Sequence, residues 1–181
     1  QKKRFSFSNN RFPYFQEKIY ITQQVGKNDI SKVKRIYNNH QIEFFIESFF
    51  EDIFEKIKKA HLIITRSGGS SVAEILTSCR PVIFIPLPTS FDNHQLENTK
   101  LITKIGAGWV LHQNNEIIKT LKKLLENLIK NPKKLVIASN QMKKLSEDLE
   151  VKRKNKPATE FFSDVLIDLI KTNHKKISKP C

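Results

Sequence analysis

The segment from Thr65 to Glu74, with the sequence TRSGGSSVAE, constrains the fold of this chain more than any other. It follows the apolar run 61–64 and precedes the helix-like segment 72–76, so it predicts a strand, a turn of small residues and a helix start. In such a turn, backbone N–H groups and the positive end of the helix dipole face the same space. Gly68 and Gly69 would let the backbone approach a ligand closely. An anionic ligand, such as a nucleotide diphosphate, is the expected occupant.

Predicted strands and helices alternate along the rest of the chain. We expect strands at 18–22, 41–46, 61–65, 81–86 and 108–111, and helices at 28–39, 51–59, 72–78 and 93–105. From residue 116 the pattern is helical, with a break at Asn131–Pro132. This alternation is typical of right-handed βαβ units, so we predict an α/β fold with a Rossmann-like, doubly wound parallel sheet. Ligands of such sheets bind at the carboxyl ends of the strands.

Composition divides the chain into three expected parts. Residues 1–16 are expected to be irregular, residues 17–150 to form one α/β domain, and residues 151–181 to hold a basic linker, an amphipathic helix and a disordered tail. The tail helix has one apolar face flanked by lysines. That face is expected either to pack against the main domain or to contact an anionic membrane surface.

The net charge of +14 has two explanations. A strongly basic chain attracts phosphates, as in nucleic acid, an anionic membrane or a phosphorylated lipid. The joint abundance of Lys, Asn, Ile and Phe also fits A/T-rich codons. Nucleic acid is disfavoured, because binding it requires exposed aromatic side chains among the basic ones, and most Phe lie in apolar runs. Cys79 and Cys181 form neither a zinc motif nor a disulfide framework, so we expect free thiols in the cytosol.

Three loops are expected to meet at the carboxyl edge of the sheet. They are residues 23–26, residues 66–71 followed by Glu74, and residues 86–95 followed by Asn98. Their amides, hydroxyls and carboxylate suit a sugar nucleotide. Simpler explanations stay open: Ser71-x-x-Glu74 as a capping box, Asp92-x-x-Gln95 as a helix cap, and His94 as a surface side chain instead of an acid or base.

The combined pattern resembles the MurG family. The segments that carry this resemblance are 65–74, PVIFIPLP at 81–88, DNHQ at 92–95 with Asn98, and GAG at 106–108. The similarity runs from about Tyr20 to Val110 and more weakly to about Leu149. This bacterial family transfers N-acetylglucosamine from UDP-N-acetylglucosamine to the undecaprenyl-pyrophosphoryl-muramyl-pentapeptide precursor of peptidoglycan. The resemblance implies that residues 17–150 are the C-terminal, nucleotide-sugar donor-binding half of a GT-B type glycosyltransferase.

The resemblance also implies roles for individual residues. The turn would line the phosphates and the ribose, Glu74 would hold ribose hydroxyls, and Gln95 would bind hydroxyls of the N-acetylglucosamine. The main chain of Phe50 would contact the uracil edge. The full set of implied donor-binding residues is Gln24, Phe50, Arg66, Gly68, Gly69, Ser70, Ser71, Glu74, His94, Gln95 and Asn98. The implied reaction is an inverting displacement without a bound metal or other cofactor, and no residue of this chain is identified as the catalytic base.

The sequence departs from the family pattern in one major respect. The family's N-terminal, acceptor-binding domain is missing, and so is the Gly-Gly-Ser-x-Gly-Ala motif that opens the family's C-terminal domain. We therefore expect a transferase fragment that uses a lipid-linked acceptor at the cytoplasmic face of the inner membrane. The alternatives are a soluble donor-binding half of a two-chain lipid-linked N-acetylglucosamine transferase, an inactive remnant that binds nucleotide only, and a nucleic-acid-binding module.

Overall fold

The computed structural model describes residues 19–88 and 94–153, with the single positions 157, 160, 163, 164 and 167. The expected irregular segment 1–16 and most of the expected linker, tail helix and tail at 151–181 lie outside the described residues. The chain divides into two compact units, residues 1–52 and 53–181, and each is described by itself.

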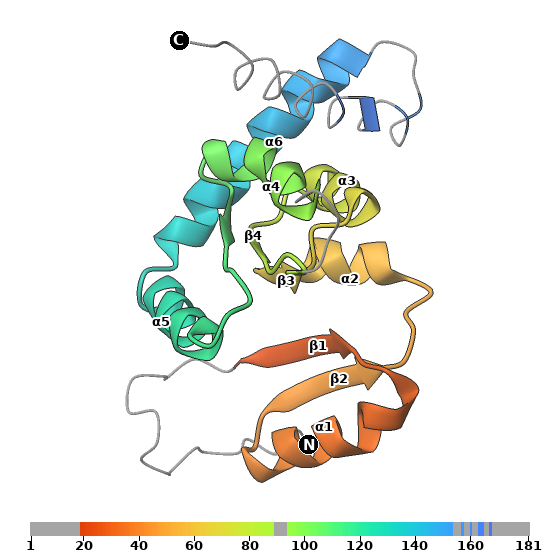
Figure 1. Cartoon of the computed structure of the whole chain (residues 1–181), viewed down its shortest axis with the longest axis vertical. Helices are drawn as coiled ribbons and strands as arrows, with labels where there is room; N and C mark the ends of the chain where they lie inside the picture. The colour runs from red at the N-terminus through yellow and green to blue at the C-terminus, as the bar shows by residue number, and fades with distance from the viewer. Residues whose placement is uncertain are drawn as a thin grey trace, which may run out of the picture. The chain divides into compact units, whose positions relative to one another are not determined.

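The first unit is a parallel βαβ element. Strand β1 (Tyr20–Gln24) leads through a 3-10 turn, η1 (Lys27–Asp29), and helix α1 (Ile30–Asn39) to strand β2 (Glu43–Glu47). The two strands pair in parallel, from Tyr20 opposite Glu43 to Gln24 opposite Glu47. Helix α1 lies along the strand pair (Figure 1), where the rings of Tyr37 and Phe44 are 5.5 Å apart.

The second unit is a parallel sheet covered by helices. Its elements are α2 (Ile53–Lys59), β3 (Ile63–Thr65), α3 (Gly69–Ser78), β4 (Val82–Phe84), α4 (His94–Lys104), β5 (Gly108–Val110), α5 (Ile117–Lys130) and α6 (Lys133–Arg153). The strand order is β3-β4-β5, with Ile64, Ile83 and Trp109 side by side. The predicted break at Asn131–Pro132 separates α5 from α6 and is confirmed.

The hydrophobic core of the second unit has two sides because β4 is buried on both faces. Val82 and Phe84 pack with residues of α3, α4 and α6, whereas Ile83 packs with Leu111 and Leu128. All three β4 residues are fully buried, as an apolar central strand of a parallel sheet requires. This confirms the predicted α/β class, a parallel sheet between layers of helices. Among the described residues, the strands form two hydrogen-bonded sheets, one in each unit.

The start of α3 differs from the sequence prediction. The helix begins at Gly69 and not at residue 72, and its N-cap is Gly68, whose extended backbone has φ −63° and ψ 151°. The first helical bond runs from the N–H of Val72 to the carbonyl oxygen of Gly68. The capping-box alternative for Ser71 and Glu74 is therefore wrong, because Ser71 lies inside the first turn. Helix propensity disfavours glycine, which is why the pattern placed the start too late.

Candidate functional site

The N-terminus of α3 is open toward the carboxyl end of β3. Its N-cap residue, Gly68, makes no side-chain cap hydrogen bond, and no described side chain accepts a hydrogen bond from the first backbone N–H groups of the helix. A Cβ atom added to Gly68 or Gly69 would meet nothing within 4 Å, which shows that neither glycine is needed for packing. Ser70 is exposed and Ser71 half-buried beside them. Uncapped N–H groups at the positive end of a ten-residue helix form a binding place for an anion.

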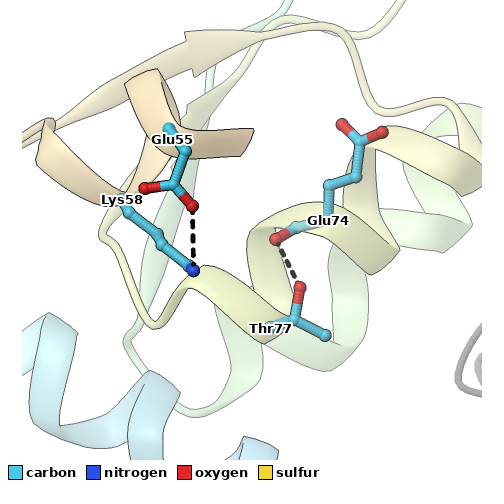
Figure 2. Close-up of polar contacts among 4 residues, drawn as sticks. All are labelled: Glu55, Lys58, Glu74 and Thr77. Carbon is cyan, nitrogen blue, oxygen red and sulfur yellow. Dashed lines mark hydrogen bonds and ion pairs between the residues drawn. The ribbon is translucent and has the colours of Figure 1, made fainter. Parts of the chain in front are cut away.

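Glu74 stands one turn further along the same helix. Its backbone carbonyl accepts a hydrogen bond of 2.9 Å from the hydroxyl of Thr77, as Figure 2 shows. The carboxylate itself is directed away from Thr77 and from the nearby ion pair of Glu55 and Lys58 on α2 (Figure 2). Within the described residues it makes no side-chain hydrogen bond or ion pair. It is therefore available to accept hydrogen bonds from a ligand.

Arg66 connects the loops that follow three strands. Its Nη1 atom donates to the carbonyl oxygens of Ile85 and Pro86, at 2.8 Å and 3.3 Å, in the loop after β4. The same nitrogen donates to Oε1 of Gln113, 2.7 Å away, in the loop after β5. Arg66 itself follows β3. The predicted site arginine thus holds the carboxyl ends of all three strands of this sheet together.

Gln95 and Asn98 on α4 attach that helix to two of the loops. The N–H of Leu87 donates to Oε1 of Gln95, 2.9 Å away, and Nδ2 of Asn98 donates to the carbonyl oxygen of Ser67, 3.0 Å away. Ser67 is fully buried, and its hydroxyl has no hydrogen-bond partner among the described residues. Both residues are half-buried, and Nε2 of Gln95 and Oδ1 of Asn98 make no hydrogen bond within the described residues, so they can bind a ligand.

The other predicted site residues are not brought to this edge by any described contact. Gln24 is the exposed last residue of β1, and Phe50 is buried with its ring stacked on Phe45 at 5.7 Å. Both belong to the first unit. His94 begins α4, but its side chain lies outside the described residues, as does Asp92 of the second suggested cap. The donor-binding roles of these residues stay predictions.

Gln113 is a site residue that sequence reasoning missed. It lies 47 positions from Arg66 in the chain, so no local motif connects the two. The available signal was its position just after a predicted strand, on the edge where the other loops were expected to meet.

Neither a metal site nor a membrane-spanning helix is present among the described residues. No group of three or more His, Cys, Asp or Glu side chains among them could hold a metal ion. No described helix has the length and apolar character that a membrane span requires.

Comparison with known protein families matches residues 5–156 to the glycosyltransferase family 28 C-terminal domain. The chain belongs to this family. The match spans most of both units and every residue of the site described above, so the turn before α3, Glu74, Gln95 and Asn98 are parts of a family 28 domain. The predicted resemblance to the MurG family and the predicted GT-B type fold are confirmed by this match together with the relatives that follow.

Two individual proteins that are similar to this chain carry the same enzyme name. One relative is the UDP-N-acetylglucosamine–N-acetylmuramyl-(pentapeptide) pyrophosphoryl-undecaprenol N-acetylglucosamine transferase of Wolbachia pipientis subsp. Culex pipiens, 42% identical over 128 residues, which are 71% of this chain and 38% of the relative. The transferase of the same name from Rickettsia bellii is 37% identical over 127 residues, 70% of this chain and 36% of that protein. The chain thus spans well under half the length of these relatives.

A solved structure has the same fold. The crystal structure of Acinetobacter baumannii MurG matches with a TM-score of 0.66 and 24% identity, covering 85% of this chain and 42% of that one. At this identity the likeness establishes the fold alone, which is the Rossmann-like α/β arrangement expected from the sequence.

Proposed function

We propose that this family 28 domain binds UDP-N-acetylglucosamine as the sugar donor of a hexosyltransferase in peptidoglycan synthesis. The acceptor is a polyprenyl-pyrophosphoryl-linked muramyl-pentapeptide, bound by a second domain that completes the enzyme. A lipid-anchored acceptor requires that the reaction takes place at a membrane, and the resemblance to the MurG family implies the cytoplasmic face of the plasma membrane. The names of the Wolbachia and Rickettsia relatives support this donor, this acceptor and this reaction.

The observation that carries the proposal is the uncapped N-terminus of α3 beside Gly68 and Gly69. A nucleotide diphosphate needs several N–H donors and a positive field, and this turn offers both, with no competing side chain among the described residues. The open space in front of the two glycines lets phosphate oxygens approach the backbone. The hydroxyls of Ser70 and Ser71 add donors at the same place.

The neighbouring side chains suit the other parts of the donor. The carboxylate of Glu74 accepts hydrogen bonds from vicinal ribose hydroxyls, which are a donor pair that a carboxylate fits. Nε2 of Gln95 and Oδ1 of Asn98 bind hydroxyls of the N-acetylglucosamine, with His94 nearby. The guanidinium of Arg66 provides positive charge at the same edge. The nucleotide-binding roles implied for Gln24 and for the main chain of Phe50 belong to the same proposal and rest on the sequence resemblance.

The chemistry is a single displacement with inversion. A hydroxyl oxygen of the acceptor sugar forms a bond to the anomeric carbon of the donor, and the bond from that carbon to the UDP oxygen breaks. UDP leaves with the electron pair, and the amides and helix end at Gly69 stabilise its charge. A general base takes the proton of the attacking hydroxyl. This domain contributes donor binding and leaving-group stabilisation.

Calorimetric titration of the purified chain tests the donor assignment. We expect saturable binding of UDP-N-acetylglucosamine that persists in EDTA, with weaker binding of GDP-mannose and of free N-acetylglucosamine. Circular dichroism of the same sample controls for folding. A folded chain that binds none of these ligands, or binds GDP-mannose equally well, would refute the donor assignment. Binding of UDP and UDP-N-acetylglucosamine with equal affinity would limit the site to the nucleotide.

A further inference from the structure

One nitrogen of Arg66 makes all of that residue's described hydrogen bonds. Nη1 has only two hydrogens, yet it contacts Oε1 of Gln113 at 2.7 Å, the carbonyl oxygen of Ile85 at 2.8 Å and that of Pro86 at 3.3 Å. The two short contacts therefore use the two hydrogens, and the long contact shares one of them. Nε and Nη2 make no hydrogen bond within the described residues, so three N–H donors are left for a ligand.

Gln113 is the one side chain among the three acceptors. The other two acceptors are backbone carbonyls, whose positions the end of β4 determines. The backbone around Gln113 is also held, because the N–H of Leu111 donates to the carbonyl oxygen of Phe84 at 2.9 Å and the N–H of Asn114 donates to that of His112 at 3.0 Å. A held backbone on both sides places the amide of Gln113 where it can orient the guanidinium.

The charge of the pair matters as much as its geometry. A carboxylate is the usual strong partner of a guanidinium and would cancel its charge. Here the partner is a neutral amide, and no carboxylate contacts Arg66 within the described residues. The guanidinium is thus fixed in place while its full positive charge remains available to an anion.

We propose that Gln113 is a positioning residue of the donor site. It acts through Arg66: the amide fixes the guanidinium and, with it, the turn from Ser67 to Gly69 that leads into α3. This holds the remaining Arg66 donors and the amides of α3 in the arrangement that the diphosphate requires. The inference rests on the proposed function, because it concerns the affinity for the same UDP-sugar.

A double-mutant cycle tests this inference. Donor affinity is measured by calorimetry for the wild type, Gln113→Ala, Arg66→Ala and the double variant. We expect Gln113→Ala to weaken UDP-N-acetylglucosamine binding about fivefold, the equivalent of one lost hydrogen bond at about 1 kcal/mol. In the Arg66→Ala background, the same substitution is expected to change the affinity by less than about twofold, because its only route of action is gone.

Gln113→Glu separates charge from geometry. The carboxylate keeps an acceptor for Nη1 but cancels the charge of Arg66, so we expect it to weaken binding of the diphosphate donor at least as much as Gln113→Ala. Asn115→Ala and Asn115→Glu are matched controls, since Asn115 is exposed in the same loop and has no described hydrogen bond. Both are expected to bind the donor nearly as the wild type does.

Each result decides the inference. The positioning role would be overturned if Gln113→Ala kept wild-type affinity, if it caused an equal loss in the Arg66→Ala background, or if the Asn115 variants lost affinity equally. Each of these results would leave the donor site intact. Absence of binding by the folded wild type would instead refute the proposed function, and the positioning role would fall with it. A loss of donor affinity without a change in the thermal midpoint distinguishes positioning from general destabilisation.

Discussion

The side-chain amide of Asn98 donates a hydrogen bond to the backbone carbonyl oxygen of Ser67, 3.0 Å away. Ser67 begins the turn before α3, and Asn98 lies in the second turn of α4, 31 positions later. The buried hydroxyl of Ser67 has no hydrogen-bond partner among the described residues. The bond from Asn98 to the Ser67 carbonyl is a side-chain contact that holds this turn. The position of the α3 N-terminus therefore depends on a side chain of a different helix.

Asn98→Ala is expected to lower the free energy of unfolding by about 1–3 kcal/mol, because it leaves a buried carbonyl without its donor. Urea denaturation followed by circular dichroism measures the change. Asn140→Ala is the matched control, since Asn140 is an exposed amide on α6 without a described hydrogen bond. Equal stability of the two variants would show that the bond to Ser67 contributes nothing.

Gly108→Ala is expected to destabilise the second unit by about 1–3 kcal/mol through overpacking. A Cβ at this position would lie 2.8 Å from Cγ1 and from the carbonyl oxygen of Val82, and 3.1 Å from Cγ2 of Ile102. Gly69→Ala is the control, because its Cβ would meet nothing and alanine favours a helix. Thermal unfolding compares the two variants, and a midpoint of Gly108→Ala at or above that of Gly69→Ala would contradict this packing.

Gln41→Gly is expected to stabilise the first unit by about 1 kcal/mol. Gln41 has φ 54° just after α1, and its N–H and that of Ile42 bond the carbonyls of Asn38 and Tyr37. This is a Schellman ending, in which glycine is the preferred residue. The exposed side chain of Gln41 has no described hydrogen bond that glycine would remove. Chemical denaturation measures the gain, and a loss of stability would contradict the left-handed conformation.

Tyr37 predicts a pH dependence of the first unit. Its hydroxyl donates to Oε1 of Gln23 at 2.5 Å, and burial raises the pKa of Tyr37 above its ordinary value of 10.0. The folded state therefore holds this proton more tightly than the unfolded state. The resulting stabilisation is complete below the unfolded pKa of about 10 and is lost as the pH rises through the folded value.

The free energy of unfolding is measured for the wild type and Tyr37→Phe, once at a pH below about 10 and once at a pH above the raised pKa of the folded state. We expect the wild type to lose more stability than Tyr37→Phe as the pH rises, so that their difference shrinks. Tyr20→Phe is the control, because Tyr20 is 60% exposed. A difference between wild type and Tyr37→Phe that grows with pH would have the wrong sign.

The sequence was sufficient to predict the elements but not all of their connections. Alternating apolar runs located the described strands and α-helices, and the strand expected at 81–86 contains β4, which is fully buried. The start of α3 was placed three residues late because Gly69 and Ser70 have weak helix propensity, and tertiary contacts at Ser67 outweigh it.

In the site as well, individual residues were predicted from the sequence but one contact between distant residues was not. Arg66, Glu74, Gln95 and Asn98 were predicted from their motifs, and Arg66, Gln95 and Asn98 do contact the loops after the strands. Gln113 was missed because its partner lies 47 positions away and no pattern along the chain records such a pairing. Single-sequence reasoning detects local spacing, whereas this contact follows from the side-by-side order of β3, β4 and β5.

The most direct test of the donor site is the affinity of Glu74→Ala for UDP-N-acetylglucosamine. Glu147→Ala serves as its matched control, because Glu147 is an exposed glutamate on α6 that pairs with Lys143 at 3.8 Å. Removal of two charge-assisted hydrogen bonds to the ribose is expected to weaken binding at least about tenfold in Glu74→Ala, and Glu147→Ala is expected to bind as the wild type does. Unchanged binding in a folded Glu74→Ala variant would contradict the proposed donor site.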